Sequence, residues 1–310
     1  MLPNVSLEVG MTIGVSRRRG LQAAVAALII NIVGGVAMAD DVKRVAANGT
    51  ELSYVEAGQG DPVIFVHGGL QDYRMWAEHL PKFAGRYRAI AYSRRNHFPN
   101  RVSPEGLPDG AADVHGEDLA AFVRALGFSK VRIVAHSAGA HAALFFAARN
   151  PDLIVSLALN EPPATGLLAG VPGAADILKE WGAGQAPARE AFKAGDTAAA
   201  IPLFVNAVGG PGAFDRRSDA DKQMNRDNAA SAQADAITTR PRPVFTCEMA
   251  KAISAPVLLS NGERSPKFFH LITDQLANCL PNRERIVVAG SSHTVPSENR
   301  PRVPRQALML

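Results

Sequence analysis

Apolar residues in this chain gather in short continuous runs, separated by stretches in which they recur every three or four positions. Runs such as Val63-Ile64-Phe65-Val66 are typical of strands that are covered on both faces of a sheet. The spacing of Leu119, Phe122, Val123 and Leu126 is typical of a helix with one buried face. The pattern predicts strands over residues 63–66, 87–92, 131–134, 153–159, 256–260 and 285–288, and helices over residues 73–80, 112–126, 140–149 and 268–280.

Turn residues set the limits of several of these elements. Asn48-Gly49 tolerates positive φ at both central turn positions, so residues 42–55 are predicted to form a hairpin. Pro81 is expected to end the helix that begins at Tyr73, because proline disrupts a helix interior.

The order of these elements predicts one α/β domain over residues 40–310. Strands that alternate with helices form parallel β-α-β units with right-handed crossovers. The strand pattern stops after Glu161 and resumes at Pro256, and the residues between are rich in Ala, Gly and polar side chains. We therefore expect a helical cap, about residues 163–251, inserted into a mostly parallel central sheet flanked by helices.

The stretch from Val131 to Gly139 passes from a strand to a helix through a single serine. Such a turn needs tiny residues two positions before and after the serine, where the strand and the helix nearly touch. Ala135 and Gly139 meet that requirement around Ser137, although the usual pattern, G-x-S-x-G, has glycine at both positions. The pattern indicates a reactive serine on a strained turn, and a serine that only caps the following helix is the alternative.

The first 39 residues are typical of an export signal. A basic cluster, Ser16-Arg17-Arg18-Arg19, precedes a mostly apolar run from Leu21 to Val36, and Ala37-Met38-Ala39 matches a small-residue cleavage site. The apolar run is shorter than the roughly 20 residues that a membrane-spanning helix needs. The basic cluster also resembles a twin-arginine signal. We expect a periplasmic or secreted protein with no stable membrane partner after cleavage, and an uncleaved membrane anchor is the alternative.

The composition suits a globular domain with a sizeable core. Of the 310 residues, 47% are hydrophobic and 20% are charged, with a formal net charge of +4. The chain has no basic block interleaved with aromatic residues, so no nucleic-acid partner is expected. The two cysteines, Cys247 and Cys279, could form an intrachain disulfide in an oxidising compartment, and two buried thiols are the alternative.

Five short segments occur in an order that resembles the α/β-hydrolase fold family, over about Val42 to Arg300. They are His67-Gly68-Gly69, the turn at Ser137, Asn160-Glu161-Pro162-Pro163, Gly262-Glu263-Arg264-Ser265-Pro266 and Ser292-His293. The order of the five is much more specific than any one of them. The resemblance implies the α/β-hydrolase fold with an inserted helical cap, and a hydrolase that uses no cofactor.

A serine hydroxyl is a poor nucleophile and needs a base within hydrogen-bond reach. Histidine suits this role because its ordinary pKa lies near neutrality. His293 lies in the loop after the last predicted strand, where the resembling family places its base. His136, directly before Ser137, is expected to point away from the nucleophile, and His67 is expected to tie its own loop together. No pair of histidines has the spacing of metal ligands, so no metal is expected.

The acid that orients the histidine has two candidates. In most α/β-hydrolases it follows the strand after the cap, but there Ser265 stands where aspartate is commonest, and a hydroxyl cannot carry the charge that stabilises an imidazolium. Haloalkane dehalogenases and zearalenone-type lactonases use a carboxylate at the end of the strand after the nucleophile. This chain has Glu161 there, 24 residues beyond Ser137. We favour Glu161 and keep Glu263 as the alternative acid.

Negative charge that develops on a carbonyl oxygen needs fixed hydrogen-bond donors. The resemblance implies that the backbone N–H groups of Gly69 and Ala138 form this oxyanion hole, and a glycine pair that only makes a tight turn is the alternative. The arginines of the polar loop over residues 93–98 could bind an acidic substrate group or pair with nearby carboxylates. Four aromatic residues could line a pocket under the cap or could be ordinary packing: Trp76, Trp181, Phe204 and Phe214.

Together these residues predict an exported serine esterase or lactonase that cleaves a small-molecule carboxylic ester or lactone through an acyl-enzyme. Ser137 would be the nucleophile, His293 the base and Glu161 the orienting acid. Haloalkane dehalogenation is not expected, because those enzymes have aspartate where Ser137 stands. A carbon–carbon bond hydrolase would use the same three residues. The non-enzyme alternative is a binding protein with a degenerate site, which the unusual acid position and the proline-containing tail over residues 301–310 would favour.

Overall fold

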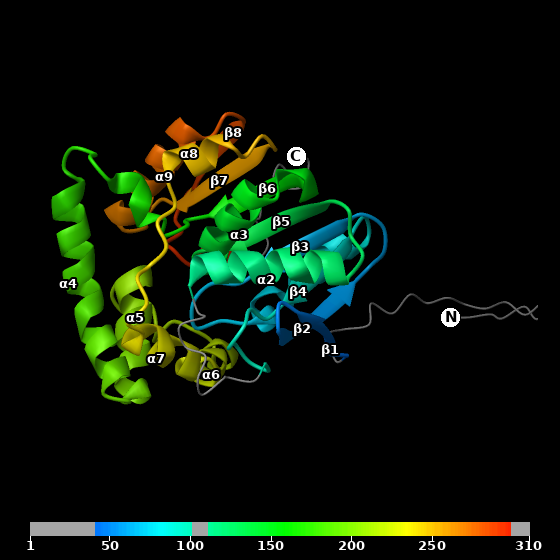
Figure 1. Ribbon diagram of the computed structural model, residues 1–310. Coiled ribbons are helices and arrows are strands. Elements are labelled where there is room, and N and C mark those ends of the chain that lie inside the picture. Colours follow the sequence, from blue (N-terminus) through cyan, green and yellow to red (C-terminus); the bar gives the residue numbers. More distant parts are fainter. Residues whose placement is uncertain (1–40, 101–110, 299–310) are drawn as a thin grey trace, which may run out of the picture. The chain divides into compact units, whose positions relative to one another are not determined.

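The structure is a computed structural model that describes residues 41–100 and 111–298 (Figure 1). Within these residues eight strands form one sheet with the order β1-β2-β4-β3-β5-β6-β7-β8. β2 pairs antiparallel with β1 and β4, and the other neighbours pair parallel. The strands are β1 (Lys43–Ala47), β2 (Thr50–Ala57), β3 (Pro62–Val66), β4 (Arg88–Tyr92), β5 (Val131–His136), β6 (Ile154–Asn160), β7 (Val257–Gly262) and β8 (Arg283–Val288).

Strand residues alternate between two apolar layers, one on each face of the sheet. In β3, Ile64 and Val66 pack into the larger layer, whereas Val63 and Phe65 pack into the smaller one. This explains the continuous apolar runs, because both faces of these strands are covered. The helices outside the cap are α1 (Leu80–Ala84), α2 (Ala112–Ala125), α3 (Ala138–Arg149), α8 (Cys247–Lys251), α9 (Lys267–Cys279) and α10 (Val295–Glu298). α8 falls within the residue range predicted for the cap but packs with the larger apolar layer. The predicted α/β class is confirmed.

Residues between β6 and β7 form a group of helices and contribute no strand. The cap helices are α4 (Ala174–Lys193), α5 (Thr197–Gly209), α6 (Asp219–Asp227) and α7 (Ala229–Ile237). Apolar residues of α4, α5 and α7 share a small core with Leu70, which belongs to the loop after β3, and α6 reaches Leu70 through a hydrogen bond from Asn225. The cap is therefore anchored directly on a loop at the carboxyl end of the sheet, where ligands bind in α/β folds.

Two local turn predictions have different outcomes. Asn48 and Gly49 have φ angles of 48° and 71° and join β1 to β2, as the sequence predicts. The prediction that Pro81 ends a helix begun at Tyr73 is wrong. Residues 73–76 form only a 3-10 turn, and Pro81 lies in the first turn of α1. Proline is tolerated there because its missing N–H would have had no intrahelical acceptor.

Cys247, at the start of α8, and Cys279, at the end of α9, are joined by a disulfide. The predicted export signal and the tail over residues 301–310 lie outside the described residues. No helix in the described ranges combines the length and apolar character that crossing a membrane requires.

Candidate active site

Ser137 occupies the turn between β5 and α3. Its φ of 51° and ψ of −121° are strained for a residue with a side chain, and its N–H donates to the carbonyl of Asn160 at 2.8 Å. A Cβ added at Gly139 would lie 2.7 Å from the carbonyl oxygen of Val66, so α3 begins in direct contact with the end of β3. This close approach explains why position 139 needs a tiny residue, although the contact is with β3 and not with the strand that leads into Ser137.

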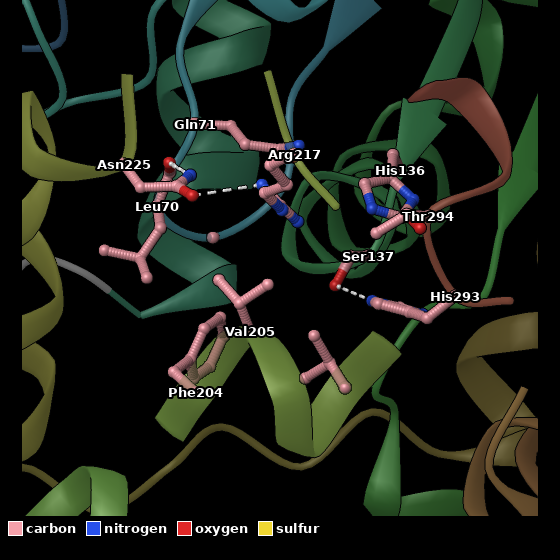
Figure 2. Close-up of a pocket in the computed structure, with 12 residues that line it drawn as sticks. Leu70, Gln71, His136, Ser137, Phe204, Val205, Arg217, Asn225, His293 and Thr294 are labelled. Atoms are coloured by element: carbon pink, nitrogen blue, oxygen red, sulfur yellow. Dashed lines mark hydrogen bonds between the residues drawn. The ribbon is translucent and has the colours of Figure 1, made fainter. Parts of the chain in front are cut away.

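His293 meets Ser137 from the loop after β8. Its Nε2 lies 3.0 Å from the Ser137 Oγ, and its Nδ1 lies 2.5 Å from Oε2 of Glu161 (Figure 2 shows the Ser137–His293 contact). The ring stacks on Phe269 of α9, with centroids 4.0 Å apart and planes 12° apart. The imidazole is thus held on one face by an aromatic ring and at both nitrogens by hydrogen-bond partners.

Glu161 is fully buried directly after β6, with a φ of 48°. Its Oε1 accepts the backbone N–H of Gly262 at 2.8 Å and the side-chain amide of Asn261 at 3.3 Å, both from the end of β7. Glu263 is exposed instead, and its carboxylate accepts the N–H of Gly290. Of the two candidate acids, the structure brings Glu161 to His293.

Gly69 and Ala138, the two candidate oxyanion donors, are both half-buried beside Ser137. Ala138 is the first residue of α3, where an N–H has no acceptor within the helix and points toward the positive end of the helix dipole. Gly69 lies in the same pocket lining as Ser137. Ala138 directly follows Ser137 and Gly69 shares its pocket lining, so both candidate donors lie beside the nucleophile.

Several residues with a strained backbone conformation lie at this site. Five non-glycine residues of the described ranges have positive φ, and three of them are Leu70, Ser137 and Glu161. Each such residue costs about 1–3 kcal/mol and persists only where the surroundings enforce it. Three strained residues on three different loops at one place are typical of a functional site.

A pocket opens onto the Ser137–His293 pair (Figure 2). Its cavity volume is about 20 Å³, and one water molecule needs about 10–15 Å³. The lining residues are Gly69, Leu70, Gln71, His136, Ser137, Phe204, Val205, Val208, Arg217, Asn225, His293 and Thr294. Of the four aromatic residues considered from the sequence, Phe204 lies in this lining, whereas Trp76, Trp181 and Phe214 pack elsewhere.

His136 was expected to point away from the nucleophile, and this is wrong. Its ring lies 4.8 Å from the ring of His293 and lines the pocket. Asn160 donates its side-chain amide to the carbonyl of Ser260, so its Oδ1 accepts from Nδ1 of His136 at 2.7 Å. Burial, with the nearby His293, holds the pKa of His136 well below its ordinary value, so the ring stays neutral.

The two arginines of the polar loop differ in their roles. Arg95 pairs with Asp118 at 2.6 Å, as one of the two interpretations expected. Arg94 is buried and donates to the backbone carbonyls of His67 and Gly68. Neither belongs to the pocket lining. Among residues 41–100 and 111–298, no three His, Cys, Asp or Glu side chains are grouped so that they could hold a metal ion.

The sequence reasoning missed four polar residues of the pocket: Gln71, Arg217, Asn225 and Thr294. Gln71 and Thr294 lie close in sequence to the predicted Gly69 and His293. Arg217 and Asn225 belong to the cap, in which no motif indicated a role. In the sequence these two are one charged and one amide residue among many polar residues of the cap, so nothing distinguishes them as pocket residues.

Comparison with known proteins places this site in a family. The family model described as alpha/beta hydrolase fold matches residues 61–299. A soluble epoxide hydrolase of Corynebacterium sp. (strain C12) is 31% identical over 36% of this chain and 37% of its own length. The 2-hydroxy-6-oxo-6-(2'-aminophenyl)hexa-2,4-dienoic acid hydrolase of Metapseudomonas resinovorans is 33% identical over 37% of this chain and 40% of its own length.

A solved structure described as Est816, an N-acyl homoserine lactone degrading enzyme, superposes with a TM-score of 0.65 at 22% identity, covering 83% of this chain and 95% of that one. This likeness shows the fold. The matched segments span 31–40% of the curated relatives' own length. The family match covers most of the domain and supports a hydrolase. The chain belongs to the α/β-hydrolase fold family, as the sequence predicted.

Proposed function

We propose that this protein is a serine hydrolase that cleaves a carboxylic ester or lactone through an acyl-enzyme. The observation that carries the proposal is the unbroken chain of contacts from Ser137 Oγ through His293 to Glu161. His293 takes the proton of Ser137 as the hydroxyl attacks the carbonyl carbon, and Glu161 stabilises the imidazolium that forms. His293 then gives the proton to the leaving alkoxide.

The backbone N–H groups of Gly69 and Ala138 hold the oxyanion in each of the two steps. After the alcohol of an ester leaves, or the ring of a lactone opens to a hydroxyacyl-enzyme, His293 removes a proton from water, which attacks the acyl-enzyme carbonyl. Collapse of the second tetrahedral intermediate releases the carboxylic acid and returns the proton to Ser137. No cofactor enters any step of this cycle.

The chemistry of the nucleophile favours acyl substrates over epoxides, although a similar relative is named an epoxide hydrolase. When a carboxylate opens an epoxide or displaces a halide, the product is an ester, which water can cleave at its carbonyl. When a serine hydroxyl does the same, the product is an ether with no carbonyl, and the enzyme cannot be regenerated by hydrolysis. Ser137 therefore suits substrates that bring their own carbonyl carbon.

Cleavage of a carbon–carbon bond next to a ketone is the second candidate. The relative from Metapseudomonas resinovorans is named a hydrolase of a 2-hydroxy-6-oxo dienoic acid. Such a substrate also offers a carbonyl carbon to Ser137, and the same base and donors would serve. The two candidates differ in the leaving group, which is an oxygen in one and a carbon in the other.

A degenerate binding protein is a weaker alternative. Binding alone gives no reason to maintain a strained serine, a buried carboxylate and a histidine aligned between them. The strain at Ser137 and Glu161 lowers the free energy of unfolding without any gain for a passive pocket. Export by residues 1–39 to the periplasm or beyond stays a prediction, and so does a small-molecule ester or lactone as the partner.

Labelling with a fluorophosphonate tests the proposal. We expect one stoichiometric adduct, located on Ser137 by mass spectrometry of the digested protein, because His293 activates that hydroxyl. Ser137→Ala should take up no label, and a scan of short-chain esters and lactones should then identify turnover. Folded protein that leaves Ser137 unlabelled would favour the binding protein and overturn the proposal.

A further inference from the structure

Arg217 brings a positive charge to the pocket. It lies between α5 and α6 of the cap, is half-buried, and lines the same cavity as Ser137 and His293. Its Nη1 donates to Oδ1 of Asn225 at 3.1 Å. Figure 2 shows the Arg217 side chain between Asn225 and the Ser137–His293 pair.

Asn225 ties this charge to the loop that faces the nucleophile. Its side chain is fully buried, and its Nδ2 donates to the carbonyl of Leu70 at 2.8 Å. That bond leaves Oδ1 of Asn225 as the acceptor for Arg217. Because Leu70 directly follows Gly69, the guanidinium is positioned relative to a candidate oxyanion donor through a single rigid side chain.

The surroundings of Arg217 in the pocket favour an anionic ligand. Its charge adds to burial and to the nearby His293 in holding down the pKa of His136, so its field reaches the pocket. An anion that enters beside apolar walls and the guanidinium gains a charge-assisted hydrogen bond. The apolar lining residues are Leu70, Phe204, Val205 and Val208.

We propose that Arg217 binds a carboxylate of the substrate, so that the ester or lactone cleaved at Ser137 also carries a free acid group. The inference rests on the proposed function. A planar guanidinium can hold a carboxylate through two parallel hydrogen bonds, which would fix the substrate in one orientation. The cavity volume of about 20 Å³ is little more than one water molecule needs, so the test uses a substrate with a short chain between the carboxylate and the scissile carbonyl.

Two esters that differ only in charge provide the test. The mono-4-nitrophenyl ester of glutaric acid carries a carboxylate where 4-nitrophenyl pentanoate has a methyl group. The wild type should prefer the anionic ester. Arg217→Met should lower kcat/KM for the anionic ester roughly 10²-fold, mainly through KM, and change that of the neutral ester less than about threefold. Arg217→Lys should restore part of the preference, because it keeps the charge.

Arg216→Met is the matched control, because Arg216 is the exposed neighbour and donates to the carbonyl of Pro211. It should leave both esters unaffected. Suppose that fluorophosphonate labels Ser137 but kcat/KM is the same for both esters, in the wild type and in Arg217→Met. That result would overturn this inference and leave the proposed function standing. Absence of labelling would instead overturn the proposed function. If labelled protein turns over neither ester, a competition experiment decides the inference. Glutarate should protect Ser137 from the label in the wild type and not in Arg217→Met, and equal labelling with and without glutarate in the wild type would overturn the inference.

Arg94 carries a second inference from different contacts. It follows β4 and is 3% exposed, and burial lowers its pKa to about 10. Its hydrogen bonds go to backbone carbonyls. Nε donates to the carbonyl of His67 at 3.2 Å, and Nη2 donates to the carbonyl of Gly68 at 2.9 Å. His67 donates its Nδ1–H to the same Gly68 oxygen at 2.8 Å.

The Gly68 carbonyl and the Gly69 N–H belong to one amide group. Resonance makes that group planar, so fixing the oxygen also fixes the direction of the N–H. Donation from a buried cation to the oxygen draws electron density from the nitrogen and strengthens its N–H as a donor. We infer that Arg94 is a positioning residue that orients and polarises the Gly68–Gly69 peptide for the oxyanion.

The inference predicts that loss of Arg94 weakens the binding of the transition state and leaves the binding of the substrate unchanged. Arg94→Met should lower kcat by about 10–10²-fold with KM nearly unchanged. Removal of a whole oxyanion donor lowers kcat by about 10²–10³-fold, and this change only weakens one donor. Affinity for a boronic acid that forms a tetrahedral adduct with Ser137 should fall by the same factor. Affinity for an uncleaved amide analogue of the substrate should not change.

Arg95→Met is the control, because it removes a neighbouring charge that pairs with Asp118. It should leave kcat and boronate affinity near wild type. Rates are divided by the amount of Ser137 that fluorophosphonate can label, which corrects for any unfolded protein. Partial recovery in Arg94→Lys, which keeps one donor, would support the inference. Unchanged kcat in Arg94→Met, or equal losses of boronate and amide affinity, would overturn it.

Discussion

Glu161→Gln should lower kcat by about 10⁴-fold on any substrate cleaved through Ser137, because the same change in a serine protease triad has that cost. The carboxylate lies 2.5 Å from Nδ1 of His293 and is itself held by the N–H of Gly262 at 2.8 Å. An amide of the same shape carries no charge to stabilise the imidazolium. Its NH₂ group can also face Nδ1 and select the wrong tautomer of His293.

Steady-state kinetics at saturating substrate measure this effect, with a thermal melt to verify that the variant is folded. Glu263→Gln is the matched control, since Glu263 is exposed and bonds the N–H of Gly290. It should retain kcat within about threefold, as surface changes usually have small effects. A large loss in Glu263→Gln together with near-normal Glu161→Gln would transfer the role to the alternative acid.

The residues at strand ends could be located from the sequence because the sheet fixes where strand ends lie. Parallel strands bring their carboxyl ends to one edge, so loops far apart in the chain meet there. Ser137 follows β5, Glu161 follows β6 and His293 follows β8. The apolar runs locate these strands, so the approach of the three side chains follows from the sheet alone and does not depend on the cap.

The cap residues could not be located in the same way. Helices α4 to α7 have no strand pairing to set their register, and the positions of the cap side chains depend on tertiary contacts such as the packing of α4, α5 and α7 on Leu70 and the Asn225–Leu70 hydrogen bond. Arg217 and Asn225 therefore carry no local pattern that distinguishes them from other polar residues. Substrate identity depends on this part of the chain, which is why the sequence predicts the reaction class better than the substrate.

His136 shows a different limit of sequence reasoning. Successive residues of a strand point to opposite faces, so a residue next to the nucleophile was expected to face away from it. Ser137 leaves the strand with a φ of 51°, which ends that alternation at the turn. Both side chains then reach the pocket. The strain that exposes the nucleophile also brings its neighbour beside His293.

Ser137→Ala should lower kcat by about 10⁶-fold, and the double variant Ser137→Ala/His293→Ala should be no slower, because the two residues act as one unit. His293 has no hydroxyl to deprotonate once Ser137 is gone, and Ser137 has no base once His293 is gone. The 3.0 Å contact between Oγ and Nε2 is the basis for this dependence. Each single variant and the double variant should therefore give nearly the same residual rate.

The residual rate itself is informative. Donors from Gly69 and Ala138 would still bind a developing oxyanion, and in subtilisin that contribution leaves about 10³–10⁴-fold over the reaction in water after the triad is removed. The three variants are compared with the uncatalysed rate under the same conditions, using protein freed of wild-type contamination. Losses that multiply in the double variant would mean that Ser137 and His293 act independently, and the acyl-enzyme mechanism would then fail.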